Sequence, residues 1–384
     1  MTARRSVGVF VLGAAISGWN CGNVGPVVGS LSSEFDIGLG AIGLLSGTFF
    51  FAGIAVADLV GAVIARRIRV LYGIWACCVF SALGNLVIAV GDSFAVLAVG
   101  RVIAGMGVGL SILFIPAYAR AMGGVRLLGL YGAGLTLGIA AALLLGSLLE
   151  GGDVDWRVAF LITAALAVVS LPILPNEVVE IVRAPANDQG LVREALTNQA
   201  WWRVEALGIT TLTIPLVIGA WLVHYLITDI GLSAGAAGVL SFLLFGISAV
   251  MRDVAGRLAG SGTSPSLLVI AGLSVAAGGI ALLGLGTSAA AATAALVLIG
   301  IGLSLPYPLF YDQGERVLPD RPLGGLGLLQ VGGNAFPILV VPLFGAALAS
   351  GDSDAAFLFL AAFTVLTAVL NATPAVPPEP AETT

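Results

Sequence analysis

The sequence predicts an all-α membrane protein in which twelve transmembrane helices form two pseudo-symmetric six-helix bundles. Hydrophobic residues make up 59% of the 384 residues and charged residues 10%, and the mean hydropathy is +1.08. A soluble domain has about a quarter of its residues charged. Three observations predict the architecture: twelve long apolar runs, arginines concentrated in every second loop between these runs, and a motif repeated half a chain apart.

The apolar runs define the expected spans, because a helix needs about 20 predominantly apolar residues to cross a bilayer. The spans lie at residues 7–30, 39–64, 70–90, 94–119, 126–149, 157–175, 202–228, 234–256, 265–286, 289–311, 324–349 and 355–373. We expect an N-terminal bundle at 1–175, a cytoplasmic linker at 176–200 and a C-terminal bundle at 201–373. The linker can form a short interfacial helix within 189–198, and the proline-rich tail at 374–384 is expected to be disordered.

The arginines orient the chain. There is no lysine, and all but two of the 16 basic residues fall on the side of the spans that carries the N-terminus; the exceptions are Arg101 and Arg157. The loops on the other side are acidic. Short cytoplasmic loops are enriched in positive charge, so both termini are expected in the cytoplasm and the chain is expected to be a multi-pass protein of the cell membrane.

The fourth span carries a full positive charge within an apolar run. A charge near the bilayer centre costs from a few to over ten kcal/mol, so such residues usually face a bundle interior or a wet cavity. Arg101, Gly105 and Gly109 are spaced by four and share one helix face. The two glycines form a small surface on which another helix can pack closely. Arg101 is therefore expected to point at neighbouring helices.

A motif near the end of the second span recurs near the end of the eighth. The chain reads Ala55-Val-Ala-Asp58-Leu-Val-Gly61 in the first and Ala249-Val-Met-Arg252-Asp253-Val-Ala-Gly256 in the second. In both, an aspartate precedes a glycine by three residues. Such an offset is expected for two parallel six-helix repeats.

These features together resemble the major facilitator superfamily over nearly the whole chain. The run Arg101-Val-Ile-Ala-Gly105-Met-Gly107-Val-Gly109 is similar to the fourth-helix motif of that family. The loop after the second span resembles its Gly-x-x-x-Asp-Arg-x-Gly-Arg motif in Gly61, Arg66 and Arg67, but has alanine where the acidic residue stands. The resemblance implies that Asp58 takes over part of that ion-pair role.

Two further resemblances bear on the type of transporter. Gly134-Leu-Thr-Leu-Gly138 resembles the fifth-helix signature of antiporters, but Ile139 replaces its proline, which weakens a drug-efflux interpretation. Arg252-Asp-Val-Ala-Gly256 and Gly332-Gly333-Asn334 resemble segments of nitrate-nitrite transporters. The matching arginine of the second helix is missing.

The resemblance implies a solute cavity near the midplane between the bundles. Polar side chains within apolar spans are the candidates to line it. The candidate substrate or coupling residues are Arg101, Asn20, Asn23, Tyr307, Gln330 and Asn334. The candidate gating or motif residues are Asp58, Gly61, Arg66, Arg67, Gly105, Gly109, Arg252, Asp253 and His224. Each has a structural alternative: Arg101 can bind backbone carbonyls of the first helix, the asparagines can join helices, and His224 can be interfacial.

The function expected from the sequence is secondary active transport of a small solute by alternating access. The first span has no acidic residue between Arg5 and Glu34, and no midplane carboxylate is visible, so an unpaired Arg101 favours an anionic solute. Proton coupling is a further hypothesis. The alternatives are a drug or metabolite efflux antiporter and, from another class, a non-transporting membrane sensor. One histidine and three cysteines without ligand spacing predict no enzyme, metal or cofactor. Nucleic-acid binding is not expected, and the protein is expected to be a monomer.

Overall fold

The computed structural model describes residues 3–64, 70–123, 125–173, 190–319 and 322–376. Within these ranges every regular element is helical. Ten helical segments are long and apolar enough to cross a membrane, and Arg157–Ser170 is apolar but shorter. Each predicted span coincides with a helix or an interrupted helix, and the predicted all-α membrane architecture is confirmed.

The first half of the chain comprises six spans, of which the first, second and sixth are built from several pieces. In order they are α1 (Ala3–Gly22) with η1 (Gly25–Val27) and α2 (Val28–Phe35), α3 (Leu39–Gly43) with η2 (Leu44–Phe49) and α4 (Phe50–Ile64), α5 (Val70–Ala89), α6 (Phe94–Gly123), α7 (Val125–Gly151), and α8 (Arg157–Ser170) with η3 (Leu171–Ile173).

The second half begins with a short helix and continues with six further spans. In order they are α9 (Leu191–Thr197), α10 (Gln199–Gly208) with η4 (Ile209–Thr213) and α11 (Ile214–Thr228), α12 (Ala234–Gly260), α13 (Pro265–Leu285), α14 (Ala289–Ser304) with α15 (Tyr307–Arg316), α16 (Pro322–Ser350), and α17 (Ser353–Leu370). The short helix expected within the linker is α9, and the part of the linker at 174–189 lies outside the described residues.

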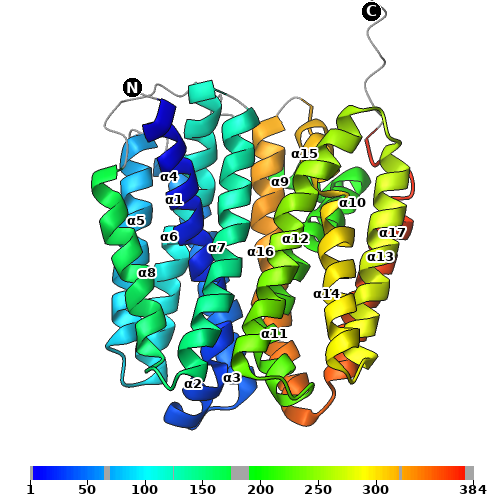
Figure 1. The fold of residues 1–384 in the computed structure, drawn as a ribbon. Helices are drawn as coiled ribbons and strands as arrows, with labels where there is room; N and C mark the ends of the chain where they lie inside the picture. The colour runs from blue at the N-terminus through cyan, green and yellow to red at the C-terminus, as the bar shows by residue number, and fades with distance from the viewer. Residues whose placement is uncertain (1–2, 65–69, 124, 174–189, 320–321, 377–384) are drawn as a thin grey trace, which may run out of the picture.

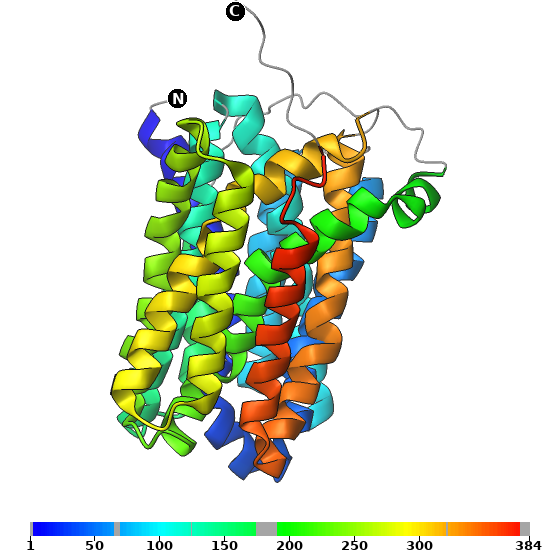
Figure 2. The same cartoon turned by 90° about the vertical axis from the view of Figure 1, so that its right-hand side faces the viewer.

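The helices stand side by side, with the start of α1 and the end of α17 at the same face of the molecule (Figure 1). We call this the N-terminal face. The opposite face, where α2 leads into α3, is the distal face. In the second view α9 lies at the edge of the molecule near the N-terminal face, at an angle to the spans (Figure 2).

Prolines account for several interruptions within the spans, because proline has no backbone N–H to donate. Pro26 lies in the 3₁₀ turn η1, between α1 and α2. Pro215 follows the π turn η4, where the carbonyl of Thr211 would need its N–H. Pro306 separates α14 from α15. The affected spans are thus jointed helices.

The two halves come closest near the distal face, at glycines. A Cβ added at Gly43 would lie 2.5 Å from the Cα of Pro342, and one at Gly25 would lie 3.0 Å from the carbonyl oxygen of Gly219. Any larger residue would push backbone against backbone. The distal ends of the two halves are therefore in direct main-chain contact.

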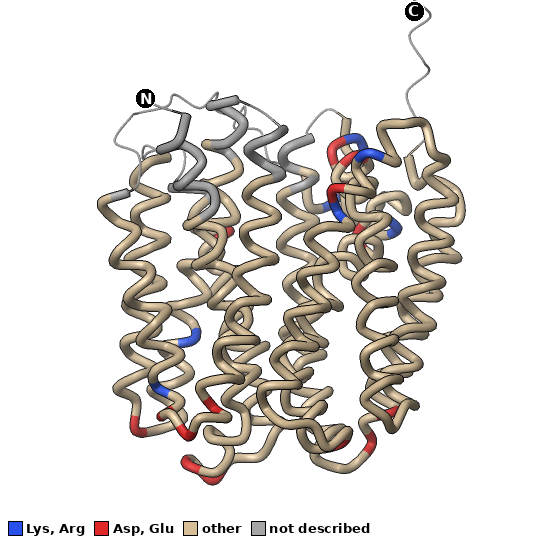
Figure 3. The backbone as a smooth tube through the Cα atoms, viewed as in Figure 1, with Lys and Arg blue, Asp and Glu red and all other residues tan. Residues whose placement is uncertain are grey.

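Charge is distributed unevenly between the faces (Figure 3). Acidic residues lie in the turns of the distal face, and the described arginines of α9, α10, α12 and α15 lie toward the N-terminal face. On the distal side Glu34 accepts hydrogen bonds from Trp156 Nε1 at 2.5 Å and Arg157 Nη2 at 2.6 Å. The Arg157 hydrogen bond, followed by that of Trp156, lowers the pKa of Glu34 from its ordinary value of 4.5.

The start of the expected tail is attached to the second half. The backbone N–H of Ala375 donates to Gln313 Oε1 at 2.8 Å, and Arg203 Nε donates to the carbonyl oxygen of Leu370 at 2.7 Å. Residues 377–384 lie outside the described ranges.

Candidate functional site

Arg101 is buried among the helices of the first half, with 2% of its surface exposed. Its Nε donates to the carbonyl oxygen of Leu45 at 3.1 Å, and its Nη1 donates to the carbonyl oxygen of Asn20 at 3.3 Å and to Asn23 Oδ1 at 3.1 Å. The expectation that Arg101 faces neighbouring helices is confirmed. Of its two backbone acceptors, Leu45 lies in the π turn η2 and Asn20 lies in the last turn of α1.

A network of amides continues from this guanidinium. Asn23 Nδ2 donates to Asn85 Oδ1 at 3.0 Å and to Thr163 Oγ1 at 3.3 Å, while Asn85 Nδ2 donates to Asn20 Oδ1 at 2.6 Å. All of these side chains are buried. We call Asn20, Asn23, Asn85, Arg101 and Thr163 the arginine–asparagine cluster. The cluster joins α1, α5, α6 and α8 by hydrogen bonds, and in an apolar interior there is little water to compete for these donors and acceptors.

The charge of Arg101 is balanced by dipoles and an aromatic ring. Its Cζ lies 4.1 Å from the centroid of the Phe50 ring, a cation–π distance. Among the described residues no carboxylate pairs with it. Its Nη2 is buried and has no hydrogen-bond partner within the described part of the chain. One donor of the cluster therefore remains available to another acceptor.

The glycines of the fourth-helix motif bring α6 against α4. A Cβ at Gly105 would lie 2.1 Å from the carbonyl oxygen of Phe50, and one at Gly109 would lie 2.7 Å from the carbonyl oxygen of Ile54. Gly61 faces α6 from the other side, where an added Cβ would meet a leucine side chain at 2.7 Å. The close helix approach expected from the glycine spacing is confirmed.

Arg252 connects the two halves near the N-terminal face. Its Nη1 donates to Thr136 Oγ1 on α7 at 3.0 Å, and its Cζ lies 4.2 Å from the ring centroid of Tyr307. The Tyr307 hydroxyl also reaches α7, where a Cβ at Gly132 would lie 3.3 Å from it. Tyr307 and Arg252, predicted separately, thus form one group.

Asp58 and Asn334 make a second contact between the halves. Asn334 Nδ2 on α16 donates to Asp58 Oδ2 on α4 at 3.2 Å. The spans that hold Asp58 and Arg252 are the two that carry the repeated motif. Each places one charged side chain against a polar residue of the opposite half, and we call these the two cross-half contacts.

Within the described residues, His224 and Gln330 form no hydrogen bond with the arginine–asparagine cluster or the cross-half contacts. His224 is on α11, with its ring centroid 6.5 Å from that of Trp221. The indole of Trp221 donates to the carbonyl oxygen of Val341 at 3.0 Å. This bond joins α11 to α16 in the distal part of the second half. Gln330 is partly buried on α16.

Asp253 points away from the cross-half contacts. It is exposed and pairs with Arg257 at 2.6 Å, one helical turn further along α12. Exposed pairs of this kind contribute little to stability. The other two predicted motif residues, Arg66 and Arg67, lie outside the described residues.

The sequence analysis missed three residues that the structure brings into these groups, and a fourth, Glu205, that is buried outside them. Asn85, Thr163 and Thr136 are polar residues within apolar runs, and the rule that selected Asn20 would have found them. Glu205 stands near the start of the seventh predicted span, yet it is only 3% exposed. Its burial depends on neighbours that are distant in the chain.

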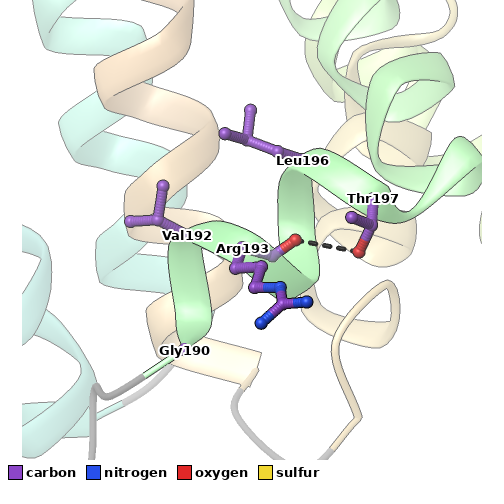
Figure 4. Close-up of a pocket in the computed structure, with 5 residues that line it drawn as sticks. All are labelled: Gly190, Val192, Arg193, Leu196 and Thr197. Carbon is purple, nitrogen blue, oxygen red and sulfur yellow. Dashed lines mark hydrogen bonds between the residues drawn. The ribbon is translucent and has the colours of Figure 1, made fainter.

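Two hollows on the described surface lie away from these residues. The close-up shows one of about 580 Å³ beside α9, lined by Gly190, Val192, Arg193, Leu196 and Thr197 (Figure 4). A second, of about 460 Å³, lies among apolar residues of α7, α12 and α14. Neither touches the arginine–asparagine cluster or the cross-half contacts.

The arrangement of these side chains is suited to binding a solute and not to making or breaking covalent bonds. Donors, acceptors and aromatic faces line the seams between helices, and the described residues hold no group of His, Cys, Asp and Glu that could bind a metal ion. No nucleophile in the cluster is hydrogen-bonded to a general base.

The sequence and fold match known membrane transporters. The family described as Major Facilitator Superfamily matches residues 10–326. A curated relative, plastidic glucose transporter 4 of Arabidopsis thaliana, is 25% identical over 210 residues, which are 52% of this chain and 36% of that protein. The match thus spans about a third of the length of that relative.

Several solved structures share the fold. The D-xylose-proton symporter aligns with a TM-score of 0.75 and 15% identity, covering 96% of this chain and 97% of the other. A bacterial homolog of the human lysosomal transporter Spinster, in an inward-facing and unoccupied conformation, aligns with a TM-score of 0.75 and 16% identity over 98% of both chains. At these identities the likeness concerns the fold alone.

Proposed function

Because the chain belongs to the major facilitator superfamily, we propose that it is a secondary transporter that carries a small solute across the cell membrane by alternating access. Family membership makes it a transporter rather than an enzyme. In such folds one half rocks against the other around a site near the membrane midplane. The moving halves would be the bundles at 1–175 and 201–373, with 176–200 as their connection.

The observation that carries this proposal is the unequal contact between the halves at the two faces. Near the distal face, glycines such as Gly43 and Gly25 bring backbone against backbone. Toward the N-terminal face, the described side-chain hydrogen bonds between the halves are those from Asn334 to Asp58 and from Arg252 to Thr136. A third, from Thr48 Oγ1 to the carbonyl oxygen of Ile338 at 2.7 Å, lies one turn of α16 nearer the distal face. Two hydrogen bonds can exchange with water at low cost, so the N-terminal face is the one expected to open from this conformation.

We further propose that the N-terminal face lies in the cytoplasm. The arginine distribution supports this orientation, because positive charge accumulates on the cytoplasmic side. The opening state would then be the one that releases or admits solute on the inner side of the cell membrane.

The solute is proposed to be small and anionic, with proton coupling. Arg101 supports this, since its charge has no carboxylate partner among the described residues and its Nη2 lacks an acceptor. An anionic oxygen bound there would supply the missing acceptor and the negative charge together.

A neutral, hydroxyl-bearing solute is the second candidate. Three acceptors and the Phe50 ring already surround Arg101. The named relatives include a glucose transporter and a D-xylose-proton symporter. On this alternative Arg101 holds the first half together, and the solute is recognised by neutral amides and hydroxyls.

Flux into proteoliposomes that contain a pH-sensitive dye separates these candidates. The purified chain would be challenged with phosphate, nitrate and small carboxylates, then with glucose and xylose, then with lipophilic cations. The account expects an anion-driven proton signal that is lost in Arg101→Gln and retained in Arg257→Gln, a matched change at an exposed arginine. Full anion transport by Arg101→Gln would overturn the anion hypothesis.

The remaining outcomes identify the alternatives. A signal with sugars alone would favour the neutral solute, and one with lipophilic cations alone would favour an efflux antiporter. No flux with any of them, from protein that is folded and inserted, would favour a non-transporting membrane sensor.

A further inference from the structure

Glu205 is a buried carboxyl group without a hydrogen-bond partner. It lies on α10 and is 3% exposed, and both Oε1 and Oε2 lack a partner within the described part of the chain. Acidic residues within membrane spans are rare, and most are paired or functional. Glu205 takes no part in the arginine–asparagine cluster or the cross-half contacts, so its burial needs a separate explanation.

The carboxyl group rests on a glycine of the neighbouring helix. A Cβ added at Gly332 on α16 would lie 2.7 Å from Glu205 Oε1 and 3.3 Å from Oε2. At Gly333 the added Cβ would lie 3.9 Å from Oε1. The two glycines therefore create the space that the carboxyl group fills.

Charged groups on the surrounding elements are engaged elsewhere. On α10 itself, Arg203 donates to the carbonyl oxygen of Leu370, the last residue of α17, and to that of Thr373. On α15, Arg316 pairs with Asp312. The sequence of α16 contains no charged residue, and the charged residue of α17, Asp354, lies in its first turn at the distal end.

The remaining titratable residues of the surrounding elements are two tyrosines and the exposed Glu315 of α15, and two residues of α9. Tyr307 and Tyr311 contact each other, with ring centroids 5.2 Å apart, and Tyr307 also faces Arg252. Arg193 and Glu194 are exposed on α9. No described group donates a hydrogen bond to either carboxyl oxygen of Glu205.

An ionised carboxylate in this place would be costly, because burying a charge without a partner is among the most unfavourable events in folding. The group must carry a proton or hold a cation. A metal cation needs several oxygen ligands, and the glycines facing Glu205 offer no side-chain oxygen. The surroundings therefore favour a proton.

We propose that Glu205 is a proton-binding site that controls the seam between α10 and α16. It is protonated in the conformation described. When the O–H bond breaks, the proton passes to water at the N-terminal face and the electron pair stays on the carboxylate. The carboxylate then requires solvation, so the seam must open to admit water.

The same stretch of α16 holds one cross-half contact, which links the proton site to the gate. Asn334 is two residues beyond Gly332 and donates to Asp58 of the first half. Pro337 has no N–H for the carbonyl of Gly333, so α16 can bend there. Gly332 and Asn334 lie about 200° apart around α16, so Glu205 and Asp58 contact nearly opposite sides of this helix, and a rotation of α16 would change both contacts together. This inference rests on the proposed alternating access, and it makes proton release the event that opens the N-terminal face.

Infrared spectroscopy of the purified full chain in lipid nanodiscs tests the proton site without any solute. We expect a carboxylic-acid C=O band at neutral pH that disappears on alkalinisation. The band should be missing in Glu205→Gln and present in Asp58→Asn, which removes the other half-buried acid of this region. Identical spectra of the wild type and Glu205→Gln at every pH would overturn the proposal.

Two glycine variants on α16 test the location of the titrating group while Glu205 itself is kept: Gly332→Ala is the test and Gly327→Ala is its control. Gly332→Ala places a methyl group against Oε1 and should shift the titration of the band. Gly327→Ala, which meets nothing within 4 Å, should leave it unchanged. Equal titration of both variants and the wild type would contradict the assigned location.

Coupling to the gate is measured by the distance between spin labels at Leu59 on α4 and Val250 on α12. Both side chains are exposed, at 61% and 64%, near the N-terminal face of opposite halves. The longer distance should gain population at high pH in the wild type but not in Glu205→Gln. If the band titrates but no solute is transported, the proton site stands and the proposed transport function fails. If solute is transported but the band is unaltered in Glu205→Gln, the transport function stands and the proton site fails.

Discussion

At the scale of single residues, Arg101 shows how a full charge is held in an apolar interior. Three acceptors from the first two spans and one aromatic ring surround its guanidinium. A planar fork of donors can satisfy acceptors at several angles at once, which a lysine ammonium on a flexible stem cannot. The position therefore requires the geometry of arginine as well as its charge.

Replacing Arg101 with lysine is expected to destabilise the protein. Each buried acceptor left unsatisfied costs about 1–3 kcal/mol. Thermal unfolding in detergent should show a clearly lower Tm for Arg101→Lys than for the wild type. Arg257→Lys, at an exposed ion pair, should hardly change it. Equal shifts in the two variants would show that the cluster does not depend on the guanidinium.

Glu34 gives the distal face a dependence on pH. Hydrogen bonds from Arg157 and Trp156 lower its folded-state pKa below the ordinary value of 4.5. The ionised form therefore adds stability above that value, and the contribution is lost as the pH falls through the lowered pKa.

Unfolding measured at neutral and at acidic pH tests this effect. The wild type should lose more stability on acidification than Glu34→Gln, in which the titrating group is absent. At neutral pH the variant should be the less stable of the two. The same loss on acidification in both proteins would show that Glu34 is not responsible.

At the scale of helices, glycines set the distances and prolines set the joints. Gly105 allows the backbone of α6 to approach the Phe50 carbonyl of α4, where a Cβ would lie at 2.1 Å. Helix association in a membrane depends on such close contacts, because there is little hydrophobic force between helices in lipid.

Gly105→Ala is expected to separate α4 from α6. Overpacking of this kind costs about 1–3 kcal/mol. A lower Tm in detergent should result, and Gly278→Ala on α13, which meets nothing within 4 Å, should unfold like the wild type. If Gly105→Ala is as stable as Gly278→Ala, the two helices are not held by this contact.

The spans were predictable from the sequence because hydrophobic length is a local property, and Arg101 was predictable because a charge in such a run must face protein. The partners of Arg101 were only partly predictable. A bond to a backbone carbonyl of the first helix was foreseen, but those to Leu45 and Asn23 depend on how the first, second and fourth spans cross.

Contacts between residues that are distant in the chain could not be predicted, because they depend on how the helices cross. The bond between Asp58 and Asn334 joins residues 276 positions apart, and nothing local to either one specifies it. Glu205 lies near a helix end in the sequence, and only the fold shows that α16 covers it.

At the scale of the whole molecule, the two halves meet through glycine backbones near the distal face and through two side-chain hydrogen bonds toward the N-terminal face, with the hydrogen bond from Thr48 to the Ile338 carbonyl between them. Direct main-chain contact is rigid, whereas a side-chain hydrogen bond can be replaced by one to water. The protein is therefore expected to have a second conformation in which the N-terminal face is open, and a third in which the distal contact separates.

Paired distance measurements test alternating access most directly. Spin labels at Leu59 and Val250 report on the N-terminal face, and labels at Val90 and Leu285, which are 77% and 60% exposed at the distal ends of α5 and α13, report on the other. Pulsed electron spin resonance in nanodiscs, with Cys21, Cys77 and Cys78 replaced by alanine, gives both distances under the same conditions. The account predicts two distance populations at each face that change in opposite directions with pH or solute. One unchanging distance at both faces would contradict it.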